Sequence, residues 1–267
     1  MADLTGKPTP LASRVAIVTG ASSGIGWALA KALAQRGYRV GLVARRTDKL
    51  QELAKEIQQA QGSARFAEAD VADRQQTLGA IHELASQLGP VDLLVANAGV
   101  GMPTLLEPVN ISDIEQMVRV NLLGVIYSIE AVLTEMLRLG KGHLAAVSSL
   151  AAYKGLPGES AYCATKSAVS TYMEGLRIHL AKRGIAVTTI CPGFVRTPMT
   201  APNKFHMPFL LEADDAAQRI IRAIERRAKV YNFPWQLNLL MKLTRYLPDW
   251  VLARSMHSYN EDPPFAT

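Results

Sequence analysis

The chain has 267 residues, which is enough for one large α/β domain or two small ones. Its 49% hydrophobic and 19% charged content is typical of a soluble globular protein rather than a disordered or fibrous one. The net charge of +6 suits a phosphorylated cofactor, nucleic acid or an anionic membrane, but no run of five basic residues forms a nucleic-acid arm.

The ends of the chain and its cysteines carry little chemistry. Cys163 and Cys191 form neither a disulfide framework nor a metal-binding spacing, which fits a reducing compartment. Residues 1–12 lack the apolar core of a signal peptide and are expected to be a flexible lead. No stretch reaches the roughly 18 uninterrupted apolar residues of a spanning helix, so we expect a cytoplasmic protein without membrane association.

Short apolar runs alternate with longer segments of helical period. The predicted strands are residues 14–20, 39–45, 63–70, 91–99, 142–149, 185–193 and 228–234. The predicted helices are residues 25–36, 47–61, 73–88, 112–138 and 159–183. Strands that are apolar on both faces and alternate with helices predict a parallel sheet. We therefore expect one α/β, doubly wound (Rossmann-type) domain over residues 13–234, with a parallel seven-stranded sheet flanked by helices.

In such a sheet, ligands bind beyond the carboxyl ends of the strands. The first six strands are followed by "TGASSGIG", "ARR", "ADVAD", "NAG", "SSLAAY" and "PGFVRTP". Glycines, small polar residues and a pair of arginines therefore gather on one rim. This clustering predicts a ligand site at that rim.

The turn "TGASSGIG" after the first strand is a candidate phosphate site. Gly20, Gly24 and Gly26 allow positive φ and a close approach of backbone to ligand, and the helix that follows offers free N–H groups. The spacing G-x-x-x-G-x-G departs from the common G-x-G-x-x-G fingerprint, and an ordinary tight turn is the alternative. Its place after the first strand of an alternating chain favours the phosphate site.

Arg45 ends the predicted second strand and Arg46 follows it, where NAD-binding domains usually carry an acid for the ribose 2′-hydroxyl. No acid occurs in this turn before Asp48. An arginine here suits the 2′-phosphate of NADP(H), whereas the alternative is a solvated arginine that leads the next helix.

Tyr162 and Lys166 are four residues apart in "SAYCATK", within the predicted helix 159–183. Residues i and i+4 share a helix face, so the ammonium is expected beside the phenol. A tyrosine normally ionises near pH 10, and a nearby cation favours the phenolate. The pair would therefore tune a proton-transfer group, although the same spacing also occurs by chance on solvated helix faces.

With "TGASSGIG", "NAG", Ser149, "YCATK" and "PGFVRT" in this order, residues 13–231 resemble the short-chain dehydrogenase/reductase family, in its NADP-preferring branch. The resemblance implies that Tyr162 is the catalytic acid/base and that Lys166 lowers its pKa and holds the nicotinamide ribose. It implies that Ser149 hydrogen-bonds the substrate oxygen, since its spacing from the tyrosine suits this role better than that of Ser148. Asn121 would prop a water bound to the lysine.

The resemblance also implies which residues contact the cofactor NADP(H). Asp70 and Val71 would contact the adenine, residues 97–99 the adenosine ribose, and residues 192–197 the carboxamide and phosphates. The predicted cofactor residues are Gly20, Ser22, Ser23, Gly24, Ile25, Gly26, Arg45, Arg46, Asp70, Val71, Asn97, Ala98, Gly99, Tyr162, Lys166, Pro192, Gly193, Val195 and Thr197.

The implied function is an NADP(H)-dependent oxidoreductase that transfers a hydride between nicotinamide and a carbonyl or alcohol. The loops 100–108, 150–159 and 199–212 are largely apolar, which favours an apolar small-molecule substrate, unless these loops form a lid that packs on itself. A reductase of an imine or of an acyl-carrier-bound ketone would use the same residues. A non-catalytic NADP-binding regulator or scaffold is the alternative from another class.

Residues 235–267 depart from the family's usual short ending. Apolar residues recur at helical spacing up to Pro248, and a second short helix is expected to about residue 256. This extension would pack on the body or a partner subunit, cover the substrate pocket, or lie on a membrane surface. In the family, the long helices at 112–138 and 159–183 pair between subunits, which implies a homodimer or homotetramer.

Overall fold

The computed structural model describes residues 14–203 and 205–255. The predicted flexible lead at residues 1–12 lies outside these ranges, and so do residues 256–267 at the end of the predicted C-terminal extension.

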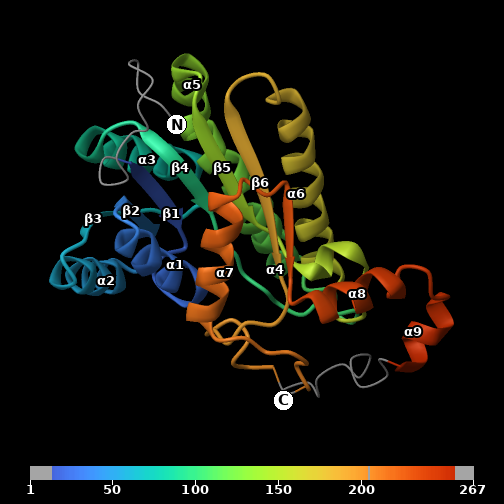
Figure 1. The fold of residues 1–267 in the computed structure, drawn as a ribbon. Coiled ribbons are helices and arrows are strands. Elements are labelled where there is room, and N and C mark those ends of the chain that lie inside the picture. The colour runs from blue at the N-terminus through green and yellow to red at the C-terminus, as the bar shows by residue number, and fades with distance from the viewer. Residues whose placement is uncertain (1–13, 204, 256–267) are drawn as a thin grey trace.

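Seven parallel strands form one sheet, in the spatial order β3-β2-β1-β4-β5-β6-β7 (Figure 1). They are β1 (Val15–Thr19), β2 (Arg39–Ala44), β3 (Ser63–Glu68), β4 (Val91–Ala96), β5 (Gly142–Val147), β6 (Ile185–Pro192) and β7 (Val230–Phe233). The predicted doubly wound, parallel seven-stranded fold is therefore confirmed.

Helices cover both faces of the sheet. They are α1 (Gly24–Gln35), α2 (Thr47–Gln59), α3 (Arg74–Leu88), α4 (Ile111–Val118), α5 (Gly124–Leu139), α6 (Ser160–His179) and α7 (Ala213–Glu225). Side chains of α1, α2 and α7 share one buried apolar cluster with the sheet. Side chains of α3, α5 and α6 share the other. Both faces of the strands are consequently buried, as their continuous apolar sequences require.

The strand order reverses beside β1. This strand pairs with β2 on one side and with β4 on the other, and both pairs are parallel. The connections from β1 and β4 therefore leave the same end of the sheet in opposite directions. A crevice opens at such a switch point, and ligands of doubly wound folds bind there.

The predicted helix 112–138 is not one regular helix. It consists of α4, a π-helical turn at Arg119–Leu123 and α5, which follow one another without a break. The predicted helix 159–183 is also too long, because α6 ends at His179. A turn with Gly184 at φ +73° then leads into β6. The apolar period continues through the buried Leu180, which made the sequence pattern longer than the helix.

Helix α7 is missing from the predicted elements. Its sequence does carry a helical signal, with Asp214 and Asp215 in the first turn. Ala216, Ile220 and Ile224 then recur at four-residue spacing and are buried against the sheet and α1. The helix could therefore have been predicted from the segment between the loop 199–212 and the last strand.

Two helices follow β7, namely α8 (Trp235–Thr244) and α9 (Asp249–Ser255). The predicted extension is thus helical in its described part. Leu237 is buried against Leu150 and Cys191, and Met241 packs on the same cluster. Helix α8 therefore packs on the body of the protein, which was one of the three expected roles.

Within residues 14–203 and 205–255, one continuous helix, Ile111–Leu139, is long and apolar enough to cross a membrane by length and composition. Its α5 part packs on β4, β5 and α3. Core helices of soluble folds have the same length and composition, and we interpret it as one of them.

Candidate active site

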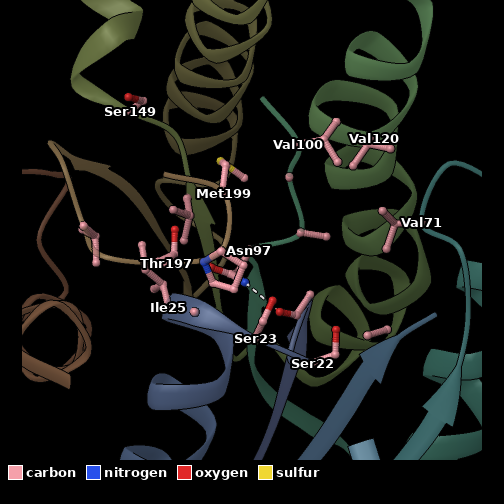
Figure 2. Close-up of a pocket in the computed structure, with 18 of the residues that line it drawn as sticks. Ser22, Ser23, Ile25, Val71, Asn97, Val100, Val120, Ser149, Thr197 and Met199 are labelled. Atoms are coloured by element: carbon pink, nitrogen blue, oxygen red, sulfur yellow. Dashed lines mark hydrogen bonds between the residues drawn. The ribbon is translucent and has the colours of Figure 1, made fainter. Parts of the chain in front are cut away.

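A cleft lies at the carboxyl ends of the strands, at the crevice between β1 and β4. Figure 2 looks into it: Ser22 and Ser23 come from the β1–α1 turn, Ile25 from the start of α1, and Asn97 and Val100 follow β4. Thr197 and Met199 enter from the segment after β6. Segments far apart in the sequence therefore form a single cleft.

The structure brings nearly all the predicted site residues to this cleft. The predicted residues that line it are Gly20, Ser22, Ser23, Gly24, Ile25, Arg45, Arg46, Asp70, Val71, Asn97, Ala98, Gly99, Ser149, Tyr162, Lys166, Pro192, Gly193, Val195 and Thr197. Gly26 and Asn121 do not line it. Both lie behind the cleft wall: Gly26 packs against Gly20, and Asn121 is hydrogen-bonded to Val100.

The glycines of the β1–α1 turn leave no space for side chains. Gly20 and Gly24 have φ of +68° and +55°, a conformation that favours glycine. A Cβ on Gly26 would lie 2.3 Å from the Gly20 carbonyl oxygen. The backbone of the turn is therefore in close contact with the residues around it. This backbone lines the cleft at the start of α1. This cradle fits the pyrophosphate of a dinucleotide, because free N–H groups at a helix start bind anions.

Arg46 folds back onto this turn. Its Nη2 donates hydrogen bonds to Ser22 Oγ (3.0 Å), Ser22 O (3.2 Å) and Ser23 Oγ (2.9 Å). Ser23 is the N-cap of α1, but its side chain makes no capping hydrogen bond. The guanidinium is thereby held beside two hydroxyls at the helix start, an arrangement that suits a phosphate group.

Arg45 has a different environment. Its Nη1 lies 3.6 Å from Asp70 Oδ2, in an ion pair in which the Arg45 side chain is mostly exposed. Asp70 itself caps the next turn by accepting a hydrogen bond from the Ala72 amide. Of the two predicted arginines, Arg46 therefore faces the glycine turn, while Arg45 is paired with the acid that was predicted to contact the adenine.

Tyr162 and Lys166 lie one turn apart on α6, and both line the cleft. The Lys166 ammonium is 5.7 Å from the centroid of the Tyr162 ring. Its Nζ donates to the carbonyl oxygen of Val147 at the end of β5 (3.0 Å). The strand thus fixes the ammonium beside the phenol, and the predicted juxtaposition is present.

The pKa of Tyr162 is shifted in the direction opposite to the expectation. Burial raises it to about 12, and the hydrogen bond with Ser149 opposes this shift only in part. The charge of Glu159, a half-buried carboxyl at the start of α6, raises it further. Burial lowers the pKa of Lys166 to about 8. Desolvation therefore disfavours the charged form of both groups. Without a bound cofactor, the phenol is protonated at neutral pH.

The two neighbouring serines point in different directions. Ser148 is buried, and its hydroxyl donates to the Lys166 carbonyl oxygen (2.8 Å) and meets the Ser170 hydroxyl. Ser149 Oγ accepts a hydrogen bond from the Ala151 amide (3.1 Å) and interacts with Tyr162. Both serines line the cleft, but the hydroxyl of Ser149 is the one that interacts with the phenol.

Asn121 is fully buried in the π-helical turn. Its amide accepts from the Val100 N–H (2.8 Å) and donates to the Val100 carbonyl (2.9 Å) and to the Thr165 hydroxyl (3.1 Å). A Cβ on Gly99 would come within 3.4 Å of both Asn121 Oδ1 and Lys166 Nζ, so Gly99 lies between them. Asn121 thus joins the strand end after β4 to the helix that carries Tyr162. π-Helical turns often occur at functional sites.

Several lining residues were not among the predicted catalytic or cofactor residues, although Val100, Met199 and Thr200 belong to loops that were predicted to select the substrate. They are Ala44, Ala69, Val100, Val120, Val147, Ser148, Pro198, Met199 and Thr200. Most are the last residue of a strand or lie directly beside a predicted residue, which was the available signal. Val120 directly precedes the predicted Asn121 in the π-helical turn, and it lines the cleft although Asn121 itself does not.

The cleft near Tyr162 is mostly apolar. A Cβ on Gly101 would lie 3.6 Å from the Met199 sulfur and 3.8 Å from the Tyr162 ring. Val100 also lines the cleft. These residues come from two of the three loops that were predicted to select an apolar substrate.

Comparison with known proteins supports the family resemblance that the sequence motifs indicated. The short chain dehydrogenase family profile matches residues 14–207. An uncharacterised oxidoreductase of Myxococcus xanthus is 42% identical over 236 residues, which cover 88% of this chain and 93% of that protein.

Two solved structures have the same fold. A variant of actinorhodin polyketide ketoreductase with NADPH superposes with a TM-score of 0.77 and 27% identity, covering 87% of this chain and 97% of that one. An alcohol dehydrogenase of Thermococcus sibiricus complexed with 5-hydroxy-NADP gives a TM-score of 0.74 and 30% identity, covering 82% and 94%.

Proposed function

The chain belongs to the short chain dehydrogenase family of oxidoreductases, and we propose that it transfers a hydride between NADP(H) and a carbonyl or alcohol. One observation carries this proposal. Ser149, Tyr162 and Lys166 line the same cleft as the glycine turn and Arg46. A proton-transfer group and a phosphate-binding cradle that line one cleft suit a dinucleotide cofactor.

The cofactor and three side chains have separate roles in the proposed reaction. When bound, the nicotinamide supplies or accepts the hydride. Tyr162 donates a proton to the substrate oxygen during reduction and removes it during oxidation. The Ser149 hydroxyl donates a hydrogen bond to the same oxygen and so stabilises its developing charge. Lys166 stabilises the phenolate that remains on Tyr162 after the proton has left.

The pKa of Tyr162 makes carbonyl reduction the favoured direction in this proposal. A phenol with a pKa of about 12 is almost entirely protonated at neutral pH, so the proton donor is ready before the hydride moves. Alcohol oxidation needs the phenolate instead. We therefore expect the rate of alcohol oxidation to increase more than the rate of carbonyl reduction when the pH rises.

NADP(H) is the proposed cofactor because of Arg46 and the two serines. The guanidinium and the Ser22 and Ser23 hydroxyls lie together at the end of β2, where a 2′-phosphate would extend from the ribose. Arg45 and Asp70 neutralise each other nearby, so Asp70 is less available to bind a ribose hydroxyl. The two structural neighbours were solved with NADPH and with 5-hydroxy-NADP, which supports the same choice.

The proposed substrate is an apolar ketone or the corresponding alcohol. Gly101 lies beside the Tyr162 ring and the Met199 sulfur, and the lining residues Val100 and Met199 carry no charge. A ketone bound to an acyl carrier is the second candidate, since one neighbour is a 3-ketoacyl-ACP reductase of Sinorhizobium meliloti, 30% identical with a TM-score of 0.76. We also propose a cytoplasmic homodimer or homotetramer that pairs through α5 and α6.

The proposal is tested by following NADPH oxidation with a panel of aliphatic, aromatic and steroidal ketones, together with an acyl-carrier-bound ketone. We expect turnover with at least one apolar ketone and a preference for NADPH over NADH. NADPH binding without turnover of any carbonyl, including an imine control, would instead indicate a binding-only regulator or scaffold.

A further inference from the structure

The C-terminal helices leave many apolar side chains in solvent. Among the described residues, 16 large hydrophobic side chains are exposed, and seven of them lie between residues 235 and 250. We call these seven the outer apolar patch: Trp235, Leu239, Leu240, Leu243, Tyr246, Leu247 and Trp250. Such a concentration is uncommon on a protein surface and marks an interaction site.

The patch faces away from the body of the protein. Leu237 and Met241, one turn apart on α8, pack inward against Leu150 and its neighbours. Trp235, Leu239 and Leu243 follow one another at four-residue spacing on another side of α8, and each is more than 50% exposed. Helix α8 therefore has two apolar sides, and the protein itself covers only one of them. Figure 1 shows α8 and α9 at the edge of the molecule, beyond β7.

Basic residues flank the outer apolar patch. Lys242 in α8, Arg245 directly after α8 and Arg254 in α9 are exposed, whereas Asp249 is the one acid in residues 235–255. Asp249 is paired with Lys154 from the body, at 3.4 Å. The patch and its surroundings therefore carry a net positive charge, on a chain whose total charge is already +6.

This charge distribution distinguishes between the possible partners. A two-fold contact between copies would place the same patch on both sides, and would therefore bring two positively charged surfaces together. An anionic lipid surface is complementary to these charges instead. Trp and Tyr side chains, which the patch carries in Trp235, Tyr246 and Trp250, are favoured at the level of lipid headgroups.

We propose that α8 and α9 dock the protein on an anionic lipid surface, with the outer apolar patch inserted among the headgroups and Lys242, Arg245 and Arg254 on lipid phosphates. This departs from the expectation that the protein does not associate with membranes. Amphipathic helices with a Trp- and Leu-rich side and flanking Lys or Arg bind membranes in this way, without spanning them. The binding would be reversible and would require anionic lipid.

The test is flotation of the full-length protein with vesicles. Vesicles of phosphatidylcholine containing about 30% phosphatidylglycerol should carry the protein upward, whereas pure phosphatidylcholine vesicles should carry much less. The double substitution Leu239→Glu with Leu243→Glu should lower the floating fraction by at least about tenfold, because it places two carboxylates in the apolar patch.

A charge-reversed variant tests the electrostatic part. Lys242→Glu with Arg245→Glu should weaken binding to the anionic vesicles by at least about tenfold, since each basic residue contributes to attraction by the surface. The matched control is Lys182→Glu with Arg183→Glu, which changes the net charge equally at two exposed residues after α6. This control should float like the wild-type protein. Circular dichroism and NADPH binding should be unchanged in both variants.

Two results would overturn the proposal. The first is a wild-type protein that stays at the bottom of the gradient with anionic vesicles at low salt. In that case, a lower molecular mass in solution for Leu239→Glu with Leu243→Glu would identify a second copy as the occupant. An unchanged mass would instead leave the chain's own residues 256–267 as the cover. The second result is equal loss of flotation in both charge-reversed variants, which would indicate a general charge effect without docking through α8.

Discussion

The ammonium of Lys166 lies 5.7 Å from the centroid of the Tyr162 ring, while its Nζ is hydrogen-bonded to the carbonyl oxygen of Val147. The lysine is thus held between a strand end and a phenol. Burial disfavours the charged form of both side chains, since it raises the pKa of Tyr162 to about 12 and lowers that of Lys166 to about 8. This desolvation raises the free energy of the folded protein. A bound molecule that interacts favourably with the charged form of either side chain would offset it.

Lys166→Met should therefore stabilise the protein at neutral pH. The folded pKa of about 8 is below the ordinary value of 10.5, so the unfolded chain binds more protons between these two values. The cost of the buried ammonium is fully present below pH 8 and disappears as the pH rises to about 10.5. The cost is at most about 3 kcal/mol, and the loss of the hydrogen bond to Val147 offsets part of it.

Thermal unfolding checks this prediction. Lys166→Met should raise Tm by about 5 °C at pH 7, and the difference should shrink as the pH rises above 8. Lys182→Met, at an exposed lysine after α6, is the control and should change Tm little at any pH. A lower Tm for Lys166→Met at pH 7 would show that the ammonium stabilises the fold.

Arg46→Ala should separate the two nicotinamide cofactors. Its guanidinium lies on the hydroxyls of Ser22 and Ser23, where the 2′-phosphate of NADPH is proposed to bind. Loss of a charge-assisted contact of this kind corresponds to roughly a 10- to 100-fold higher KM for NADPH. The KM for NADH should change less than about threefold.

Arg45→Ala is the matched control, because Arg45 is mostly exposed and paired with Asp70. Its effect on the NADPH to NADH ratio of kcat/KM should be smaller than that of Arg46→Ala. Equal losses with both cofactors in Arg46→Ala would contradict the assignment of the 2′-phosphate site.

Gly26→Ala should abolish dinucleotide binding. Its new methyl group would lie 2.3 Å from the Gly20 carbonyl oxygen and 2.6 Å from Asn97 Nδ2, so the turn that forms the cradle must move. We expect the Kd for NADPH, measured by fluorescence titration, to rise by more than about 100-fold, together with a lower Tm.

Gly79→Ala in α3 is the control for this substitution. No atom lies within 4 Å of the added methyl group, and alanine favours a helix by about 1 kcal/mol over glycine. This variant should bind NADPH normally and unfold at a slightly higher temperature. Normal NADPH binding by Gly26→Ala would mean that the glycine turn is not the phosphate cradle.

The sheet could be predicted from the sequence because its strands are apolar on both faces. Runs such as "RVAIVTG" and "RVGLVAR" have no solvated side, and only a parallel sheet covered by helices buries them completely. The strand order then places the ends of β1 and β4 together. For the same reason, most of the cleft could be predicted: its residues directly follow strands, so their position depends on chain order rather than on detailed packing.

Other features depend on tertiary packing and were wrong or absent in the prediction. The π-helical turn around Asn121 adds one residue to a helical turn, and the apolar period of the sequence does not reveal it. The pKa of Tyr162 was expected to fall because of Lys166. Sequence spacing indicates that two groups are close, but not how much water their surroundings exclude, and here desolvation has the larger effect.

The C-terminal extension also has a feature that the sequence pattern does not predict, namely which of its apolar residues are buried. Trp235, Leu237 and Leu239 have similar apolar character, yet only Leu237 is buried. The periodicity predicted a helix, and α8 is one. Which of its sides packs on the body depends on the position of Leu150 and Cys191, two residues that are distant in the sequence.

The central claim is that Tyr162 transfers the proton in a hydride-transfer reaction. The most direct measurement is the kcat of Tyr162→Phe for ketone reduction, alongside its Kd for NADPH and the same values for Tyr153→Phe. Tyr153 bonds to Asn232 outside the cleft and should tolerate the change. We predict that kcat falls by about 10²- to 10⁴-fold only in Tyr162→Phe, with NADPH binding retained. Turnover within a few fold of the wild-type rate in that variant would contradict the account.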